Sequence, residues 1–311
     1  MLVEAIKSRA VELGFDLAGI APAAPAAHRE HFRRWLDEGL AGSMHPWLER
    51  RFEERTDPRV YLPGAQSIIC VAANYFAPVP STTATPPGQR GRIARYALGE
   101  DYHQVMMRRL HTLADWLRRQ CPGARTRCAV DTAPVMEKEH AARAGIGWMG
   151  KNTCIINPRL GSWLVLGEII TTASLPPDQP LPDRCGTCTR CIDACPTHAI
   201  IAPYRLDARR CIAYLTIEHR GQIPDELRGA VAPWLFGCDV CQEVCPWNAH
   251  ATPARDPAFA PRLPPEGLDV HEVLRWTDDD RRAILRRSAM RRATLSMLKR
   301  NAGITAGGCG T

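Results

Sequence analysis

Eight of the 13 cysteines lie between residues 185 and 245, at spacings that suit metal clusters. The first four spell C-x2-C-x2-C-x3-C-P, the run in which bacterial ferredoxins bind one 4Fe-4S cluster with three thiolates and a second cluster with the fourth. The later run, C-x2-C-x3-C-P, is one ligand short, and Cys211 can supply it. The crosswise rule then gives two complete sets: Cys185, Cys188, Cys191 and Cys245 for one cluster, and Cys195, Cys211, Cys238 and Cys241 for the other.

Structural zinc is the alternative for these cysteines, because C-x2-C pairs also build four-thiolate zinc sites. Three cysteines at two consecutive x2 spacings and the paired Cys-Pro endings favour clusters instead. The sequence therefore predicts two 4Fe-4S clusters, which would relay single electrons. The remaining cysteines are expected to be small buried side chains or inert surface thiols: Cys70, Cys121, Cys128, Cys154 and Cys309.

Two short motifs resemble ligand sites only in part. Residues 145–152 read GIGWMGKN, but Asn152 stands where a phosphate-binding loop needs Ser or Thr, and a helix rather than a strand is expected before it. We expect its glycines to mark a close approach of the backbone to another chain segment or to a ligand. Asp101 and His103 begin like the signature of a histidine-ligated cobalamin, but Met106 replaces its glycine, so Asp101 is expected to cap a helix.

Alternating helices and strands must position these residues. Apolar periodicity predicts helices over residues 2–13, 28–40 and 101–120 and another that ends near 144. Apolar runs predict strands over 15–20, 67–73, 125–130, 153–156 and 163–170, and prolines and glycines make 78–91 a loop. The predicted fold class is α+β: residues 1–175 form an α/β-type domain with a mixed sheet and flanking helices, residues 176–250 a bacterial ferredoxin-like two-cluster domain, and residues 251–311 a proline-rich connector with a short, basic, helical tail.

The composition is that of a globular protein. The chain has 311 residues, of which 45% are hydrophobic and 23% charged, so disordered and fibrous classes are excluded. Much of the net charge of +7 lies at residues 281–300, where eight Lys or Arg and no acid favour a polyanion such as RNA. No apolar stretch reaches the roughly 18 residues that span a membrane. We expect a cytoplasmic protein without a signal peptide, in a compartment where thiols stay reduced.

Longer strings resemble the epoxyqueuosine reductase family. They include VDTAPVMEKEHAARAGIGWMGKNT at 130–153, CGTCTRCIDACPTHAI at 185–200 and GCDVCQEVCPWN at 237–248, and the similarity runs in order over nearly the whole chain. The resemblance implies a cobalamin-dependent enzyme, related to reductive dehalogenases, that holds the corrinoid base-off and receives electrons from two clusters. Its reaction would reduce epoxyqueuosine to queuosine at the wobble position of tRNA, the last step of queuosine biosynthesis. Longer members carry a C-terminal helical-repeat extension that this sequence lacks, so we expect a difference in how tRNA is held.

The resemblance also implies roles for individual residues. Asp131 would donate a proton during epoxide reduction, and the alternative is that it only N-caps a helix starting near Thr132. Arg55 would contact the corrinoid, or could instead pair with Glu54 or Asp57. The residues implied at cobalamin are Arg55, Arg95, Asp131, Met136, Lys151, Asn152, Thr153, Cys154, Ile155, Leu166, Asp239 and Val240. The candidate tRNA contacts in the basic tail are Arg286, Arg287, Arg291, Arg292, Lys299 and Arg300.

Two other functions fit part of the sequence. A reductive dehalogenase could share the corrinoid and the clusters, but the missing export signal and the arginine-rich tail count against it. A ferredoxin-type electron carrier would use the cysteine motifs and leave the first domain, Asp131 and the tail without a role. The leading prediction is therefore a monomeric tRNA-modifying reductase that contacts no membrane and receives electrons from an external donor of flavodoxin or ferredoxin type.

Overall fold

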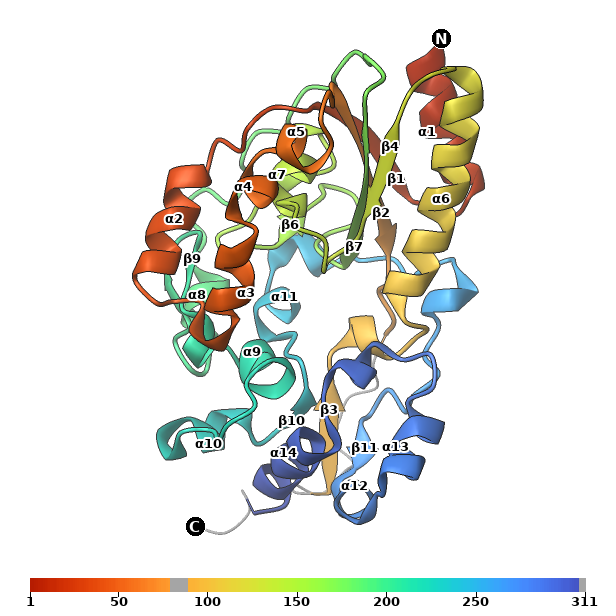
Figure 1. The fold of residues 1–311 in the computed structure, drawn as a ribbon. Coiled ribbons are helices and arrows are strands. Elements are labelled where there is room, and N and C mark those ends of the chain that lie inside the picture. Colours follow the sequence, from red (N-terminus) through yellow and green to blue (C-terminus); the bar gives the residue numbers. More distant parts are fainter. Residues whose placement is uncertain (79–88, 308–311) are drawn as a thin grey trace.

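The computed structural model describes residues 1–78 and 89–307 (Figure 1). Most of the predicted loop 78–91 lies outside the described residues, as does Cys309. The last two residues of that predicted loop belong to strand β3 (Arg90–Ile93), so the loop is shorter than predicted at this end.

A four-stranded sheet in the order β1-β2-β7-β4 organises the N-terminal part of the molecule. All three of its pairings are antiparallel, which fits the predicted α+β class, but the mixed sheet predicted for residues 1–175 is wrong because no two neighbouring strands of this sheet run parallel. Each strand lies within two residues of a predicted range; the strands are β1 (Leu17–Pro22), β2 (Ser67–Asn74), β7 (Leu164–Thr171) and β4 (Thr126–Ala129).

Helices cover both faces of this sheet. Strand β2 is buried along its whole length, so its side chains alternate between two cores. Ile69 and Val71 belong to the core with α1 (Leu2–Glu12) and α6 (Tyr102–Gln120), whereas Cys70 and Ala72 belong to the core with α7 (Glu137–Arg143). Figure 1 shows α1 and α6 side by side along one face of the sheet.

Helix α6 begins at the predicted cap. A carboxylate oxygen of Asp101 accepts a hydrogen bond from the backbone N–H of His103 at 3.1 Å, which confirms Asp101 as the helix cap. The buried residues of α6 recur every three or four positions and so form one stripe against the sheet: Val105, Met106, Leu110, Leu113, Ala114 and Leu117.

A second, three-stranded sheet joins distant parts of the chain. In it β10 (Trp234–Phe236) runs parallel and β11 (Leu268–Asp269) antiparallel to β3. Helices α12 (Val270–Arg275) and α14 (Leu295–Gly307) pack on it and share its core. Mixed pairing thus occurs in this small sheet, and each of the three segments predicted as separate domains contributes one of its strands.

The basic segment 281–300 is helical but not one continuous helix. It is divided among α13 (Asp278–Ile284), a 3-10 turn η7 (Ala289–Arg292) and α14. Arg287 has φ +61°, and a residue in this left-handed region cannot continue a right-handed helix. Met290 and Leu298 are fully buried, so the tail is part of the folded core.

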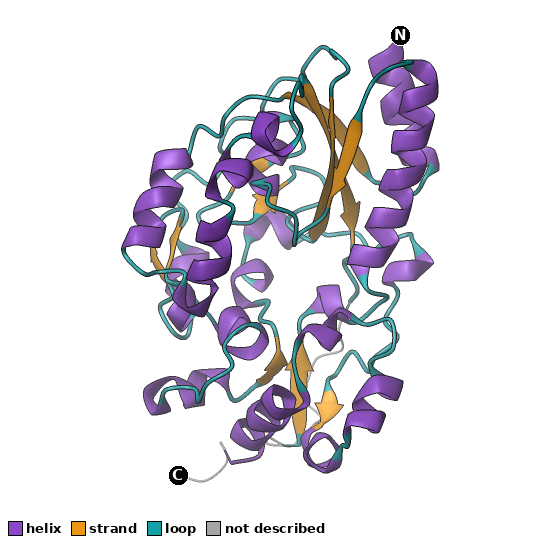
Figure 2. Cartoon of the chain, viewed as in Figure 1, coloured by secondary structure: helices purple, strands orange, loops and turns teal. Residues whose placement is uncertain are grey.

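The other elements surround the cysteine motifs and the N-terminal helices (Figure 2). Two small sheets pair β5 (Trp148–Met149) with β6 (Ile155–Ile156) and β8 (Ile200–Ala202) with β9 (Arg205–Leu206). The remaining α-helices are α2 (Arg29–Asp37), α3 (His45–Arg50), α4 (Phe52–Thr56), α5 (Pro58–Tyr61), α8 (Arg190–Asp193), α9 (Ile212–Ile217), α10 (Asp225–Val231) and α11 (Val240–Glu243). Across the part of the chain that the structure describes, no helix is long and apolar enough to cross a membrane.

Candidate functional site

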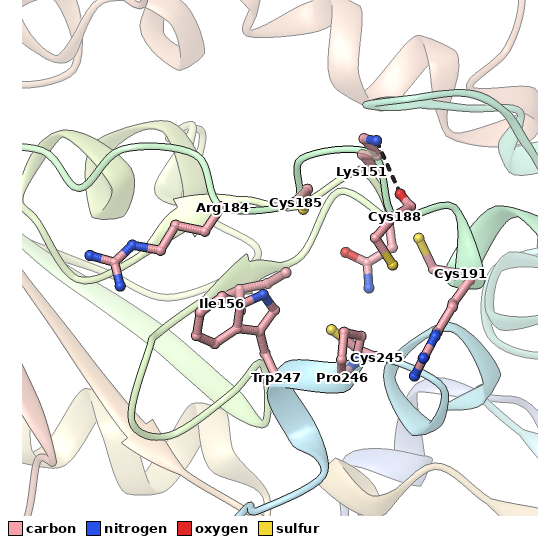
Figure 3. A pocket seen from close by; sticks show the side chains of 11 residues that line it. Lys151, Ile156, Arg184, Cys185, Cys188, Cys191, Cys245, Pro246 and Trp247 are labelled. Carbon is pink, nitrogen blue, oxygen red and sulfur yellow. Dashed lines mark hydrogen bonds between the residues drawn. The ribbon is translucent and has the colours of Figure 1, made fainter.

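Four cysteines, called here the outer set, line one pocket: Cys185, Cys188, Cys191 and Cys245 (Figure 3). The pocket encloses about 60 Å³. Burial, together with the negative charges of the other three thiolates, raises the pKa of Cys191 to about 11. Bound iron would instead hold such thiols deprotonated. The four thiols are therefore neighbours in space, as a shared cluster requires.

The other four cysteines, called here the inner set, form a second group: Cys195, Cys211, Cys238 and Cys241. Burial and the charges of Cys211 and Cys195 raise the pKa of Cys238 to about 12. A contact with the Cys154 thiol, burial, and the charges of Cys238 and Cys211 raise the pKa of Cys241. The two groups have the same members as the two sets derived from the spacing rule, and the assignment of each ligand to a cluster stays a prediction.

The spacing of the thiols bears on the zinc alternative. A zinc ion draws its sulfur ligands to about 2.3 Å from one centre. Over residues 1–78 and 89–307, no three His, Cys, Asp or Glu side chains lie close enough to bind a single metal ion. A four-iron cluster binds each thiolate at a different iron, so its ligands stand further apart. The preference for clusters over zinc rests on the ferredoxin-like spacing of the two cysteine runs.

Prolines end the short helices of both cysteine runs. Helices α8 and α11 pack against each other, and Pro196 and Pro246 follow each of them by three residues. A proline has no N–H to continue the helical ladder, so each helix stops after a single turn. Cys195 and Cys245 consequently lie just beyond the helix ends, where they can reach the neighbouring set.

The loop 151–155 connects the two cysteine sets. Lys151 donates hydrogen bonds from Nζ to the carbonyl oxygens of Gly186 and Cys188, at 2.6 and 3.0 Å, and so fixes the outer set. Asn152, which is buried, accepts from the backbone N–H of Cys154 at 3.2 Å and donates to the carbonyl of Cys241 at 3.4 Å. These residues were predicted as cofactor contacts, and their observed partners lie in the cluster loops.

The glycines before this loop are there for backbone packing. A Cβ atom on Gly147 would lie 2.4 Å from the carbonyl oxygen of Ile156, closer than any real contact. This confirms the predicted close approach of another chain segment. Thr153 in the same loop has φ +63°, a conformation that is uncommon for a residue with a side chain.

Asp239 and Arg95 form a buried ion pair beside the inner set. Asp239 Oδ2 accepts hydrogen bonds from the backbone N–H of Arg95 at 2.8 Å and from its guanidinium at 3.1 Å. Burial raises the pKa of Asp239 to about 6 even though the arginine opposes the shift. Arg95 also bonds Glu243 at 2.7 Å and stacks 4.8 Å from the centre of the Trp163 ring.

Asp131 occupies an exposed turn and does not cap a helix. Helix α7 begins only at Glu137 and its N-cap residue is Met136, so the alternative that Asp131 caps a helix at Thr132 is wrong. The physical reason is Pro134, which disfavours helical backbone at Ala133. Asp131 has φ +45°, and its side chain is 47% exposed. The turn thus leaves the carboxylate available for contacts other than helix capping.

His103 is a partner of Asp131 that the sequence did not reveal. Its Nε2 lies 3.1 Å from Oδ2 of Asp131, and its Nδ1 lies 2.7 Å from Oδ1 of Asp101. Burial lowers the pKa of His103, but its hydrogen bonds and the charges of both carboxylates outweigh burial and raise the pKa to about 9. His103 is therefore an imidazolium at neutral pH, with one N–H directed at Asp131. The sequence signal was the Asp-Tyr-His string, which suggested only a helix cap.

Arg55 and Glu137 lie near the same carboxylate. The Arg55 guanidinium is buried, bonds the carbonyl of Ala133 at 3.4 Å and interacts with the charges of Glu137 and Asp131. It does not pair with Glu54 or Asp57, which bond Arg51 and Arg59 instead. Glu137 accepts from the backbone N–H of Asp131 at 3.2 Å. Burial and the Asp131 charge raise the pKa of Glu137 to about 7.

Aromatic and apolar side chains join the Asp131 turn to the inner set. Rings follow one another from Trp163 through Tyr75 and Tyr96 to Tyr102 and His103, with centres between 4.0 and 6.4 Å apart. Burial raises the pKa of the Tyr96 phenol, and the nearby negative charges of Asp131 and Asp239 raise it further. The predicted cofactor residues Ile155 and Leu166 share one buried cluster with Val135 of the Asp131 turn.

The basic tail lies against the Asp101 side of this site. The carbonyl of Arg287 accepts from the backbone N–H of Asp101 at 2.7 Å. Arg286, Arg287 and Arg291 are exposed, and their side chains have no polar partner within the described ranges. By contrast, Arg292 bonds Glu218 at 2.8 Å, and Arg300 bonds the carbonyls of Leu215 and His219 at 2.6 and 2.7 Å. Two of the six predicted tRNA contacts thus have partners within the protein.

An α+β domain with a carboxylate–imidazolium pair, joined to eight cysteines in ferredoxin-like runs, defines an iron–sulfur oxidoreductase. Residues 184–248 match the family described as 4Fe-4S double cluster binding domain, and residues 55–132 match Epoxyqueuosine reductase QueG, DUF1730. An epoxyqueuosine reductase of Synechococcus sp. (strain RCC307) is 47% identical over 312 residues, covering 96% of this chain and 92% of the relative. That of Escherichia coli (strain K12) is 39% identical over 294 residues, covering 94% and 77%.

Solved structures give the same result. A crystal structure of epoxyqueuosine reductase with a tRNA-Tyr epoxyqueuosine-modified stem loop matches with a TM-score of 0.90 at 32% identity, over 98% of this chain and 80% of that one. The Bacillus subtilis enzyme, with its aspartate-bearing catalytic loop swung out of the active site, matches with a TM-score of 0.90 at 31% identity over the same shares. The chain belongs to the epoxyqueuosine reductase family.

Proposed function

We propose that this protein reduces the epoxide of epoxyqueuosine at the wobble position of tRNA to the alkene of queuosine, with two 4Fe-4S clusters as the electron relay and cobalamin as the reducing cofactor. The observation that carries the proposal is the series of rings from His103 to Trp163, which continues through the Arg95–Asp239 ion pair to Cys238 of the inner set and so connects that set with the Asp131–His103 pair. The reduced thiols and the tRNA substrate suit the cytoplasm, and we take the active form to be a monomer.

Asp131 and His103 are the proposed proton source. Converting an epoxide to an alkene takes up two electrons and two protons and releases the oxygen as water, so the reaction needs an acid at the departing oxygen. Asp131 is exposed enough to meet a substrate, and the His103 imidazolium points one N–H at its carboxylate. In this proposal the His103 imidazolium passes a proton to the Asp131 carboxylate, Asp131 delivers it to the epoxide oxygen, and bulk water reprotonates His103, so that the same relay supplies the second proton.

The residues around the site fit a corrinoid. The Nε atoms of Arg55 and Arg95 are buried and have no hydrogen-bond partner among the residues described, so they can donate to phosphate or amide oxygens of a bound group. Ile155, Leu166 and Val135 form an apolar cluster that Ala133, the hydrogen-bond partner of Arg55, packs against. Bound cobalamin would supply the redox chemistry of cobalt. Met136, Thr153, Cys154 and Val240 remain proposed contacts on the strength of the family resemblance.

The tail cations are the proposed contacts to tRNA. Arg286, Arg287 and Arg291 are the exposed and unpaired members of the predicted set, and η7, which carries Arg291, packs near Asp101. Lysine and arginine contacts to phosphate supply affinity without base specificity. We therefore assign the strongest electrostatic contribution to these three arginines, and a smaller one to Lys299, Arg292 and Arg300.

The proposed function is tested by anaerobic turnover. Protein reconstituted with iron, sulfide and cobalamin would be reduced with dithionite and mixed with tRNA that carries epoxyqueuosine. Digestion of the tRNA and mass spectrometry of its nucleosides should show loss of epoxyqueuosine matched by gain of queuosine. Fully loaded and reduced protein that leaves the nucleoside unchanged would rule the proposal out.

A further inference from the structure

The chain around the first three cysteines of the outer set is open to solvent. Cys245 is buried and the other seven cysteines of the two sets are all partly exposed, but the chain between Cys185 and Cys191 is exposed at Gly186, Thr187, Thr189 and Arg190. The inner set lies instead beside the buried Asp239 and the Cys154 thiol, on the way to Asp131. Electron tunnelling falls off steeply with distance, so an external protein that docks over this exposed stretch would pass its electrons to the outer set.

Unpaired positive charge borders the outer pocket. Arg184 and Arg190 line it, both are exposed, and neither side chain has a hydrogen-bond or salt-bridge partner in the described residues. Figure 3 shows Arg184 extended to one side of the pocket, away from the sulfur atoms. Lys151 adds a third cation at the same rim, although carbonyl oxygens hold its ammonium in place.

The carboxylates in this region already have partners. Asp183 accepts from the Tyr204 hydroxyl and from the backbone N–H of Cys185. Asp193 accepts from the Thr189 hydroxyl at 2.7 Å, and Glu243 bonds two arginines at 2.7 Å. Two arginines neutralise Glu243, whereas Asp183 and Asp193 accept only from neutral groups and keep their charge. The charges of Arg184 and Arg190 have no salt-bridge partner among the described residues and are available to a partner protein.

A groove with apolar and charged residues lies beside these arginines. A shallow groove of about 620 Å³ continues from the outer pocket and shares Arg190, Cys245 and Pro246 with it. Trp247, packed edge-on against Trp148 at 4.9 Å, and Ile156 give the pocket an apolar floor. Small contact areas with an apolar centre and a charged rim suit weak, short-lived electron-transfer complexes, in which charge mainly speeds association.

We infer that Arg184, Arg190 and the groove over Cys245-Pro246 form the docking surface for an acidic one-electron donor protein. This inference rests on the proposed function, because only a reductase that consumes electrons needs such a donor. Each encounter oxidises the donor by one electron and reduces the outer cluster by one electron, so two encounters support one epoxide reduction.

The test separates docking from catalysis by observing the clusters directly. Reconstituted wild-type protein and the variant Arg184→Glu/Arg190→Glu would each be mixed with reduced flavodoxin in a stopped-flow instrument, and bleaching of the cluster absorbance followed. The second-order rate constant of the variant should fall by about tenfold or more at low salt, with a flatter dependence on ionic strength. Reduction by dithionite, which needs no protein docking, should proceed at the wild-type rate.

The matched control is Arg108→Glu/Arg119→Glu, which makes the same charge change at two exposed arginines of α6 without side-chain partners in the described structure. It should leave the flavodoxin rate within about twofold of wild type. Equal flavodoxin rates in both double variants would overturn the docking surface while leaving the tRNA assay of the proposed function untouched. If dithionite reduction also slowed, the glutamate variant would have damaged clusters, and Arg184→Gln/Arg190→Gln would replace it. Iron and sulfide content would be measured to confirm that this second variant keeps its clusters. An unimpaired flavodoxin rate in the second variant would refute the inference.

Discussion

At the scale of single residues, the pair formed by His103 and Asp131 is the feature with the clearest chemical consequence. The sequence predicted Asp131 through its motif, but it could not predict His103 as a partner. The two residues are 28 positions apart, and only the antiparallel packing of the sheet against α6 brings the start of that helix to the Asp131 turn. Glu137 was missed for the same reason, because its nearness to Asp131 depends on a turn that delays α7.

The variant His103→Gln should lower tRNA turnover about 10- to 100-fold, since glutamine can hold a hydrogen bond to Asp131 but cannot resupply a proton. The wild-type rate should fall as pH rises through about 9, where His103 loses its proton, and the variant should lack this alkaline limb. Protonated His103 also stabilises the fold. Its contribution to the free energy of unfolding is complete below pH about 6.5 and is lost as the pH rises through the raised pKa.

The control for this prediction is His111→Gln, which changes an exposed histidine of the same helix. Its pH–rate profile should match wild type. An alkaline limb that survives in His103→Gln would assign the ionisation to another group and demote His103 to a structural contact.

At the scale of elements, strand β7 carries a buried acid that the fold leaves without a partner. Both carboxylate oxygens of Glu168 are inaccessible and have no hydrogen bond within the described residues. Burial, with a further contribution from the Glu137 charge, raises the pKa of Glu168 well above its ordinary value. An unpaired buried charge is strongly unfavourable, so the side chain is held as the neutral acid.

The variant Glu168→Gln should therefore stabilise the protein at alkaline pH. An acid with a raised folded-state pKa binds its proton more tightly when folded, so its contribution to stability falls as pH rises above about 4.3. Thermal unfolding should show the variant melting roughly 2–4 °C above wild type at pH 8 and close to it at pH 5.

Glu139→Gln is the matched control, because Glu139 is equally buried but bonds the backbone N–H of Ala27 and the His28 ring. That variant should melt below wild type at both pH values. A Glu168→Gln variant that is also destabilised at pH 8 would show that the carboxylate has a partner when cofactors are bound.

The strands and main helices of this domain were predictable because their apolar patterns are long and regular. Strands β2 and β7 and helix α6 fall within about one residue of their predicted ends. The start of α7 was not predictable from apolar periodicity. Pro134 and the left-handed backbone of Asp131 prevent the helix from starting before Glu137. The break in the helical tail at Arg287 was also not predictable from the sequence, because arginine is not a residue type that indicates a positive φ.

At the scale of the whole molecule, the basic tail contacts the chain at Asp101, which bonds His103 of the Asp131–His103 pair. The variant Arg286→Glu/Arg291→Glu should weaken binding of an epoxyqueuosine tRNA stem loop about tenfold and flatten the salt dependence of its log affinity by about 1–2. Fluorescence anisotropy at several salt concentrations measures both quantities.

The Arg108→Glu/Arg119→Glu protein serves again as the control, with the same change in net charge on helix α6 instead of the tail. It should shift the affinity by less than about twofold. Equal losses in the two variants would mean that overall charge, and not the tail, attracts the tRNA.

The central claim, a cluster-fed reductase with Asp131 as its acid, is tested most directly by one comparison under single-turnover conditions. Wild type and Asp131→Asn, both loaded with clusters and cobalamin and fully reduced, would be given the same epoxyqueuosine tRNA, and queuosine measured by mass spectrometry over time. Wild type should convert its tRNA, while Asp131→Asn should bind tRNA with unchanged affinity, keep its cluster spectrum and convert at least about 100-fold more slowly. Conversion by Asp131→Asn at the wild-type rate, or no queuosine from loaded and reduced wild type, would contradict the account.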